Sequence, residues 1–359
     1  MTEHIAFDVH KHYTWATVET QQGQVLKEGK VFHTPDALSG FLRHHCAPGG
    51  RVAVETVGNW YWVVDEIEAA GFVPLLVNAR KAKHMMDNAN KTDRLDNRGI
   101  NRLQRSGTLP TVWIAPPEVR DQRELPRTRM MMVRQRTQVK NRILASYGKQ
   151  GLGKTECSDP FGKGGRLVLA SQLTQLPAHC QQAVRCMFAE LDSLEQQIGV
   201  LETRMQEVFT PTAEHQLLQS LPGVGFLLAV VIATEIGDIQ RFRRAESLTG
   251  YAGVVSSVRA SGGKTRHGRP RKDINHHLKW AFLEAANGIV MNIGRHPDWH
   301  VSRLYRRIKA TRGYQKAVGA VARHLSEAAF WVLTKQQPYQ EPASPTGEQA
   351  RYAHKPTEA

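Results

Sequence analysis

The chain has 359 residues, enough for two or three domains with hydrophobic cores of their own. Its 48 lysines and arginines outnumber its 33 aspartates and glutamates, and the resulting net charge of +15 favours a polyanionic partner such as nucleic acid. It contains neither an apolar run of about 18 residues nor an N-terminal signal core, which argues against a membrane-spanning or secreted protein.

The distribution of charge and the spacing of the cysteines indicate where nucleic acid binds and which redox environment the chain occupies. The basic excess is concentrated between Arg241 and Arg323, so we expect nucleic acid to lie mainly on the C-terminal half. The cysteines form no C-x-x-C pair and no zinc-finger spacing, so we expect free thiols in a reducing cytoplasm. They are Cys46, Cys157, Cys180 and Cys186.

The first hundred residues alternate strand and helix patterns. The residue patterns predict strands at 5–9, 13–18, 24–32, 52–55 and 72–77, helices at 35–45 and 60–70, and a last helix that carries Asp93 and Asp96. This order is that of an RNase H-like α/β domain. In that topology the first and fourth strands are neighbours. We therefore expect Asp8 and Glu55 to emerge together at the sheet edge, where open α/β sheets bind ligands.

The acidic pair in the last of these helices has two interpretations. Asp93 and Asp96 stand three residues apart, which places both carboxylates on one helix face about 5–6 Å apart. Taken alone, the pair is a solvated acidic helix face, and Lys91 or Arg94 can screen the repulsion between the two carboxylates. With the two acids at the strand ends, it completes a set able to hold two divalent cations that act on a phosphodiester. Oxygen ligands favour Mg²⁺ or Mn²⁺ over zinc.

The middle of the chain predicts paired helices. Pro116-Pro117 closes the first domain, and a long basic helix follows from Glu118 to Tyr147. The glycine-rich stretch from Gly148 to Gly165 predicts a hinge or a disordered turn. From Val184 to Val208, apolar residues recur every three or four positions, a heptad seam that needs a partner helix. That partner is either the 118–147 helix folded back or, as we prefer, the same helix of a second subunit.

The C-terminal third predicts a mainly helical domain. Its first turn, L-P-G-V-G, resembles a helix-hairpin-helix element that offers backbone N–H groups near Gly223 and Gly225 to phosphate, with a plain helical hairpin as the alternative. A short basic helix is expected from Arg241 to Ala252. Basic helices at 118–147 and 295–323 are candidates to hold RNA or DNA. Further helices are expected at 273–291, 298–311 and 314–335, and a disordered tail at 337–359.

A basic, glycine-rich segment without acids spans residues 258–272 and predicts a flexible loop that clamps phosphate. In it, Ser261 precedes Gly262-Gly263, among cations that would stabilise a phosphodiester under attack. The residues alone favour phosphate contact by Ser261 and leave a role as nucleophile as the minority interpretation. The positions expected to contact nucleic acid are Arg259, Lys264, Arg266, Gly268, Pro270, Arg271 and Lys272.

Taken in order, these motifs resemble the DEDD transposases of bacterial insertion sequences, the insertion-sequence 110 family. The resemblance extends from about residue 4 to 335. Ala6 stands where many members have glycine, and Gly253-Val-Val-Ser256 stands where they have G-L-T-P, but neither change removes a functional group. The motifs are D-V-H-K at Asp8, A-V-E-T at Glu55, N-K-T-D-R-L-D at Asp93 and Asp96, L-P-G-V-G, G-Y-A-G and S-G-G-K-x-R at Ser261.

The resemblance implies a RuvC-like domain at 1–115, a helical coiled-coil linker at 116–212 and a C-terminal transposase domain at 213–336. It implies that Ser261 is a nucleophile that forms a transient phosphoserine link to DNA. The implied partners are donor and target DNA, a structured bridge RNA that pairs with both, and further copies of the chain in a tetramer. The implied location is the bacterial cytoplasm, at the nucleoid during DNA exchange. The implied ligands of Mg²⁺ or Mn²⁺ are Asp8, Glu55, Asp93 and Asp96.

Three other functions are compatible with parts of the sequence. The main alternative is a RuvC-type junction resolvase or nuclease that uses metal-activated water and not Ser261. An actin-like sugar kinase fits less well, because Val9-His10 stand where its phosphate loop needs glycine. A non-catalytic nucleic-acid chaperone would account for the charge but not for the four acids.

Overall fold

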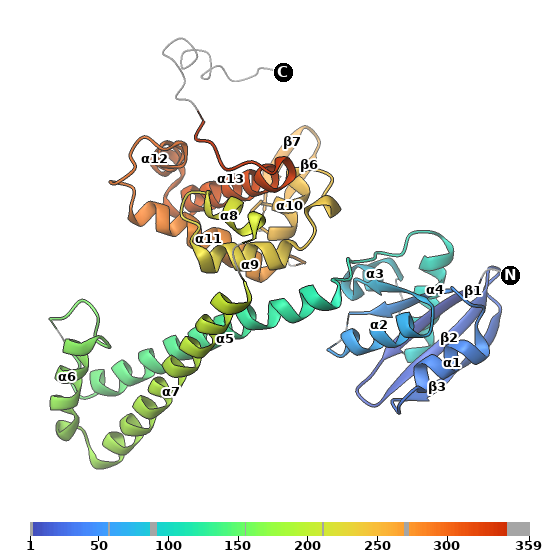
Figure 1. Cartoon of the computed structure of the whole chain (residues 1–359), viewed down its shortest axis with the longest axis horizontal. Helices are drawn as coiled ribbons and strands as arrows, with labels where there is room; N and C mark the ends of the chain where they lie inside the picture. The colour runs from blue at the N-terminus through green and yellow to red at the C-terminus, as the bar shows by residue number, and fades with distance from the viewer. Residues whose placement is uncertain are drawn as a thin grey trace, which may run out of the picture. The chain divides into compact units, whose positions relative to one another are not determined.

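The strands expected near the N-terminus form one mixed sheet, which lies in the blue part of Figure 1. The strand order is β3-β2-β1-β4-β5. The computed structural model describes residues 3–56, 58–86, 92–154, 156–209, 212–268 and 273–342. β1, β2 and β3 are antiparallel, whereas β4 runs parallel to β1 and β5 parallel to β4. The sheet is consistent with an RNase H-like domain and confirms that the first and fourth strands are neighbours. The strands are β1 (Glu3–Val9), β2 (Tyr13–Thr20), β3 (Val25–Phe32), β4 (Arg51–Glu55) and β5 (Val73–Val77).

Four helices cover the two faces of this sheet. Successive residues of a strand point to opposite faces, so Ile5 and Phe7 pack in one cluster with residues of α1 and α2, whereas Ala6 packs in another with residues of α3 and α4. The short basic α3 is an addition to the predicted elements, and it buries only Ala82 and Met86. The helices are α1 (Ala37–His45), α2 (Trp60–Ala69), α3 (Ala79–Met86) and α4 (Asp93–Arg105).

The chain divides into two compact units, Met1–Ala115 and Pro116–Ala359. The second unit begins with a helical hairpin in which α5 (Pro117–Gly148) packs along α7 (Ala178–Val208) (Figure 1). Every seventh residue of the predicted seam is buried there, from Val184 to Met205. The seam therefore has a partner inside the chain, which is the folded-back alternative rather than the one we preferred.

The glycine-rich stretch between these helices is only partly a turn. The structure extends a helix, α6 (Lys163–Gln172), into its last three residues. Gly165 lies so close to Pro160 that an added Cβ would stand 2.4 Å from the Pro160 carbonyl oxygen. The expected hinge is therefore wrong at its C-terminal end, because the glycine there serves close packing against the preceding turn.

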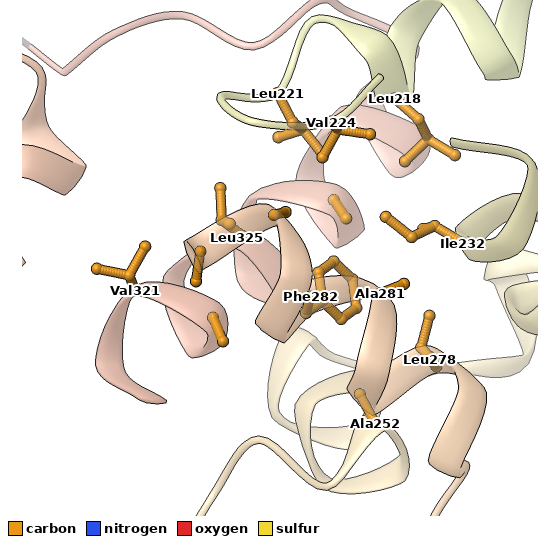
Figure 2. Packing of buried hydrophobic residues seen from close by; sticks show 14 of the residues in the cluster. Leu218, Leu221, Val224, Ile232, Ala252, Leu278, Ala281, Phe282, Val321 and Leu325 are labelled. Carbon is orange, nitrogen blue, oxygen red and sulfur yellow. The ribbon is translucent and has the colours of Figure 1, made fainter. Parts of the chain in front are cut away.

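The remaining helices pack around one apolar core (Figure 2). Phe282 and Ala281 of α11 lie fully buried among side chains such as Ile232, Leu218 and Leu325. No described helix is long and apolar enough to cross a membrane. The helices are α8 (Ala213–Gln219), α9 (Phe226–Ile236), α10 (Ala245–Ala252), α11 (His276–Met291), α12 (His300–Arg312) and α13 (Tyr314–Lys335).

Two departures from the predicted elements concern basic segments. The segment expected as a loop contains a hairpin of β6 (Val258–Ser261) and β7 (Lys264–His267). The helix expected from Arg241 begins only at Ala245, because the Arg244 backbone is extended. The Arg241 guanidinium lies over the rings of Phe242 and Tyr251, 4.1 and 4.5 Å from their centroids.

The first residues of the expected tail are also ordered against the second unit. The Tyr339 amide donates a hydrogen bond of 2.7 Å to Oγ of Ser220, and the His300 amide donates to the Glu341 carboxylate. The expectation of a tail without structure is therefore wrong for residues 337–342. The rest of the tail, 343–359, lies outside the described residues.

Candidate active site

The end of β1 and the start of α4 bring two of the predicted acids together. Oδ2 of Asp8 lies 3.3 Å from Nε2 of His10, and the same nitrogen lies 3.1 Å from Oδ2 of Asp93. One ligand atom from each of the three residues lies within 4.8 Å of the others. Among the described residues, this is the one group of three such side chains with the spacing of a metal site.

Buried amides fix α4 against the sheet. Nδ2 of Asn97 donates to the carbonyl oxygens of Ala6, at 3.0 Å, and Trp15, at 2.5 Å. One turn further, Asn101 donates to the Thr17 carbonyl at 3.3 Å. Because these bonds reach the backbone of β1 and β2, they set the position of the whole helix. Its first turn, which carries Asp93 one turn before Asn97, is thereby held beside the end of β1.

The N-terminus of α4 also suits negative charge. Oγ1 of Thr92 caps the helix by accepting a hydrogen bond of 3.2 Å from the Leu95 amide. Asp93 and Asp96 both stand in the first turn, where unpaired backbone N–H groups and the helix dipole stabilise carboxylates. The helix N-terminus therefore offsets part of the repulsion between these two acids.

The neighbouring arginine is engaged elsewhere. Nε of Arg94 lies 2.6 Å from Oε2 of Glu28 in β3, and Arg98 contacts the same carboxylate at 3.2 Å. Arg94 is therefore not the cation that screens Asp93 from Asp96, as one interpretation of the sequence allowed. Lys91, the other candidate, lies outside the described residues.

The environment of Asp8, burial first, works against its ionisation. Burial raises the pKa of this carboxyl most, His10 lowers it, and the charges of Asp93 and Asp96 raise it again, so that the net shift is upward. Asp96 therefore acts on Asp8 through its charge. A divalent cation would reverse this balance, because it stabilises all three carboxylates in the ionised form.

Tyr13 completes the contacts of Asp93. Its hydroxyl donates a hydrogen bond of 3.1 Å to Oδ2 of Asp93, and its ring stacks on that of His10 with 4.6 Å between centroids. Desolvation first, and then the bond to Asp93 and its charge, raise the pKa of Tyr13. The side chain therefore stays a neutral donor that orients Asp93 and His10.

Glu55 is placed by the register of the strands. Phe7 of β1 pairs with Val54 of β4, so Asp8 and Glu55 are the next positions of the two parallel strands. Glu55 follows Ala53 by two residues, and Ala53 packs in the cluster that holds α3 and α4 side chains. Its position is thus on the face of the sheet that α4 covers, where its side chain is half-buried.

The donor atoms fit a hard divalent cation. Carboxylate oxygens from Asp8 and Asp93 are the ligands that Mg²⁺ and Mn²⁺ prefer, and one imidazole nitrogen is compatible with such a set. The raised pKa of Asp8 and the crowding of carboxylates around it mark a site whose charge is not balanced by the protein alone. The group is consistent with a metal site.

The predicted nucleophile belongs to the other unit. Ser261 is the last residue of β6, pairs with Lys264 across the hairpin and is exposed. Gly262 and Gly263 both have positive φ, 57° and 74°, as a two-residue hairpin turn requires. Arg259 and Arg266 face each other in the register.

The other residues predicted to contact nucleic acid lie at the end of the hairpin or outside the described part of the chain. Gly268 closes the hairpin, since its amide donates a bond of 2.8 Å to the Ser257 carbonyl. Pro270, Arg271 and Lys272 lie outside the described residues, as does the side chain of Arg259.

The L-P-G-V-G turn joins α8 and α9 and serves the core as well as the surface. A Cβ at Gly223 would stand 2.5 Å from the Ala285 carbonyl oxygen, so this glycine lets the turn pack on α11. Gly225 caps α9 in open space. The turn borders a pocket whose rim includes Glu341, a carboxylate that would repel phosphate at this point.

Sequence reasoning missed His10 and Tyr13. Both lie close to Asp8 in the chain, and His10 stands inside the D-V-H-K motif that was used for Asp8 alone. A histidine two residues after a strand-end carboxylate is a usable signal, because the turn after β1 folds it back onto that carboxylate. Tyr13 gives no such signal, since its contact depends on the distant Asp93.

The N-terminal unit is thus a DEDD nuclease domain in which Asp8, His10 and Asp93 form a group consistent with a metal site. Residues 5–146 match the model of the DEDD domain described as a transposase, and residues 215–305 match the transposase IS116/IS110/IS902 family. The chain belongs to this IS110/IS116/IS902 family of transposases, enzymes that transfer DNA strands.

Curated relatives align over most of the chain. The transposase for insertion sequence element IS1111A of Coxiella burnetii is 26% identical over 81% of this chain and 79% of its own length. The transposase for insertion sequence element IS1328 of Yersinia enterocolitica is 23% identical, over 79% and 84%. The mini-circle putative transposase for IS117 of Streptomyces coelicolor is 33% identical over a shorter region, 38% and 36%.

Proposed function

We propose that this transposase cuts and exchanges DNA strands with two parts of the chain: a divalent-metal site and a serine nucleophile. The metal site is formed by Asp8, Glu55, Asp93 and Asp96, with Mg²⁺ or Mn²⁺ as the ion. The observation that carries the proposal is the meeting of Asp8 and Asp93 at one imidazole nitrogen, although they are far apart in the sequence. Carboxylates with uncompensated charge, held by buried amides, are typical of a site built for a metal.

The residues of the metal site have separate tasks. A divalent ion held there would supply polarisation of a phosphodiester and stabilisation of the charge that develops on its oxygens. Asp8 and Asp93 supply ligands from two different elements, and Asn97 keeps the two elements in register. Tyr13 orients Asp93 through its hydroxyl. His10 stands between the two carboxylates, where its Nε2 would offer a further ligand.

Ser261 is the proposed nucleophile. Its hydroxyl oxygen attacks the phosphorus, the Oγ–P bond forms, the bond to the leaving sugar oxygen breaks, and the serine proton passes to a base while the leaving oxygen takes one up. The free hydroxyl of another DNA strand then attacks the phosphoserine and regenerates Ser261. Support comes from the exposed position beside a Gly-Gly turn and from Lys264 across the hairpin, whose charge suits the transition state.

The proposed partners are donor and target DNA, a bridge RNA that pairs with both, and further copies of the chain in a tetramer. A strongly basic protein that leaves sequence reading to base pairing needs many backbone contacts and few base contacts. Sequencing the RNA that copurifies with the chain tests guidance. One structured RNA species encoded beside the gene is expected, and random cellular RNA would contradict it.

Two substitutions test the proposed division of labour. Ser261→Ala should abolish the covalent protein–DNA adduct and strand exchange while DNA binding persists. Asp93→Asn should abolish cleavage and its dependence on Mg²⁺. Mapping the trapped adduct to its residue is the direct measurement, and an adduct on another residue would remove Ser261 from the mechanism.

A second candidate function is a junction resolvase or nuclease that uses metal-activated water. The observation that favours it is that the Asp8–His10–Asp93 group is assembled within the N-terminal unit alone. This alternative predicts that Ser261→Ala still cleaves DNA and leaves no adduct on the wild-type chain. The same experiment therefore separates the two functions.

A further inference from the structure

A groove of about 1000 Å³ lies at the base of the hairpin that carries Ser261. One side of the groove is formed by α10 and the segment that follows it, and the other side by α12 and α13. Val258 and Gly268, the two ends of the hairpin, also line it, and Leu283 and Ile308 contribute an apolar surface. The groove and the hairpin belong to the same unit.

The groove is strongly basic. Five cations line it, and of its described lining residues only Glu246 is acidic. Arg323 is engaged with Glu327, at 2.8 Å, and Glu246 itself lies 3.9 Å from Arg244. For the other four, no carboxylate of the described chain stands within ion-pair distance. These four are Lys279, Arg307, Arg312 and Lys316.

Gathering unpaired cations along one groove costs free energy through repulsion, unless a polyanion enters it. The start of α13 adds to this field. Gln315 and Lys316 line the groove in its first turn, where backbone N–H groups have no helical acceptor and attract phosphate. Cations on flexible stems, together with helix-terminal amides, recognise a phosphate backbone without reading bases.

The hairpin connects this groove to Ser261. Val258 lies in the groove and pairs with His267, and the register continues without a break to Ser261 and Lys264. Three residues of extended strand span about 10 Å. A nucleic-acid strand with a rise of about 3.4 Å per nucleotide covers that length in roughly three nucleotides.

We propose that the groove holds the phosphate backbone of the DNA strand that is cut, and that it leads this strand along β6 to the Ser261 hydroxyl. The inference rests on the proposed function, since it assigns the strand that the serine attacks. The groove binds the strand, and Ser261 takes no part in that binding. The groove assignment can therefore fail while the assignment of Ser261 as nucleophile stands, and the experiments distinguish the two failures.

The test removes two exposed cations at the junction of α12 and α13. We expect the double variant Arg312→Gln/Lys316→Gln, in the full chain, to bind a short labelled single-stranded DNA more weakly. In a plot of log K against log salt concentration, its slope should be smaller in magnitude by about 1.4, since each lost contact with a single strand contributes about 0.7. Adduct formation at Ser261 should fall with the loss of binding.

The matched control is Arg204→Gln/Lys335→Gln, which removes the same charge outside the groove. The salt slope of this control should equal that of the wild type. If the control lost as much slope as the groove variant, the effect would come from net charge alone, and the proposal would be overturned. Loss of affinity for single-stranded RNA but not for DNA would overturn the assignment to DNA. Both variants should fold like the wild type, because the exchanged side chains are exposed. Thermal melting of both variants checks this.

Ser261→Ala separates this inference from the proposed function. It should bind DNA with the wild-type salt slope, because the groove is intact. If the groove variant keeps the wild-type slope while the wild type forms the serine adduct, the groove assignment fails alone. If Ser261→Ala still cleaves DNA, Ser261 is not the nucleophile, and the strand assigned to the groove is no longer identified as the one that the serine attacks.

Discussion

Nε2 of His10 lies 3.1 Å from Oδ2 of Asp93, so that a ring from the turn after β1 reaches the first turn of α4. The same nitrogen contacts Asp8, and the hydroxyl of Tyr13 donates to the same oxygen of Asp93. The carboxylates are therefore held by contacts that a bound cation can join or replace. The properties of this site can be measured without following DNA chemistry.

Metal binding should stabilise the wild-type chain. At a Mn²⁺ or Mg²⁺ concentration about 100 times the dissociation constant, the folded state gains about 2.7 kcal/mol, which raises the melting temperature. Asp8→Asn should lose most of this gain, because it removes one ligand and its charge. Glu68→Gln, an exposed change on α2, is the control that keeps the metal-induced shift. An undiminished shift in Asp8→Asn would exclude the carboxylate as a ligand.

Without metal, Asp8→Asn should increase the free energy of unfolding, and the size of this increase should depend on pH. The pKa of Asp8 is raised by burial and by Asp93 and Asp96, so the folded state holds this proton more tightly than the unfolded state. Ionisation of Asp8 therefore lowers the stability of the wild type as the pH rises through the raised pKa. The Asn variant should be the more stable one at neutral pH and equal to the wild type at low pH. Denaturant unfolding across this range in chelator measures the difference.

Asn97 should be more important for the metal site than Asn101. Asn97→Ala leaves the carbonyls of Ala6 and Trp15 without their donor, at a cost of about 1–3 kcal/mol, and releases the helix turn next to Asp93. Asn101→Ala, one turn away on the same helix face, removes one longer bond. Isothermal titration with Mn²⁺ should show a clear loss of affinity for the first variant and a small one for the second. Equal losses would show that α4 is positioned by other contacts.

Glu235 should set the acid stability of the second unit. Burial raises its pKa, but the hydrogen bonds and charge of Arg127, with Asn275 and Arg123, outweigh burial and lower the pKa. Oε1 and Oε2 lie 2.7 and 2.8 Å from the Arg127 guanidinium. This stabilisation is complete above the pKa of the unfolded state and is lost as the pH falls through the lower folded pKa.

The substitution Glu235→Gln tests this network. It removes the charge of the carboxylate that Arg127 contacts at 2.7 Å and Arg123 at 3.7 Å, and should cost about 3 kcal/mol at neutral pH. The cost should shrink in acid, where the wild type has lost the charge as well. Urea unfolding at two pH values measures it, with the exposed Glu214→Gln as the control. A cost that is the same at both pH values would assign the effect to packing rather than to charge.

The Gly-Gly turn beside Ser261 should tolerate asparagine but not valine. Gly262 has φ 57°, and a Cβ there meets nothing within 4 Å, so only backbone conformation limits the position. Valine in a left-handed conformation costs about 1–2 kcal/mol, whereas asparagine is accepted there in two-residue hairpin turns. Gly262→Val should slow adduct formation, and Gly262→Asn should keep most of it. Equal rates would show that the hairpin does not position the serine.

Several elements were predictable because their causes are local. The meander of β1 to β3 follows from β-branched runs separated by turn residues, and the α7 seam from a repeat that the sequence displays directly. The basic hairpin was predicted as a loop, although its Gly262-Gly263 pair is a turn signal, because the flanking strands are short, polar and charged. The choice of α5 as the partner of α7 was not predictable, since a heptad seam does not specify which helix covers it.

The sequence by itself determined the chemistry available to this protein: a basic chain, acids at strand and helix ends, and a serine beside two glycines. It could not determine which of these groups meet. Only the tertiary structure decided that His10 and Tyr13 join Asp8 and Asp93, that Arg94 is held by Glu28, and that basic side chains line a groove at the base of the hairpin. The reason is physical: charges act over a few ångströms, and the packing of distant elements sets those distances.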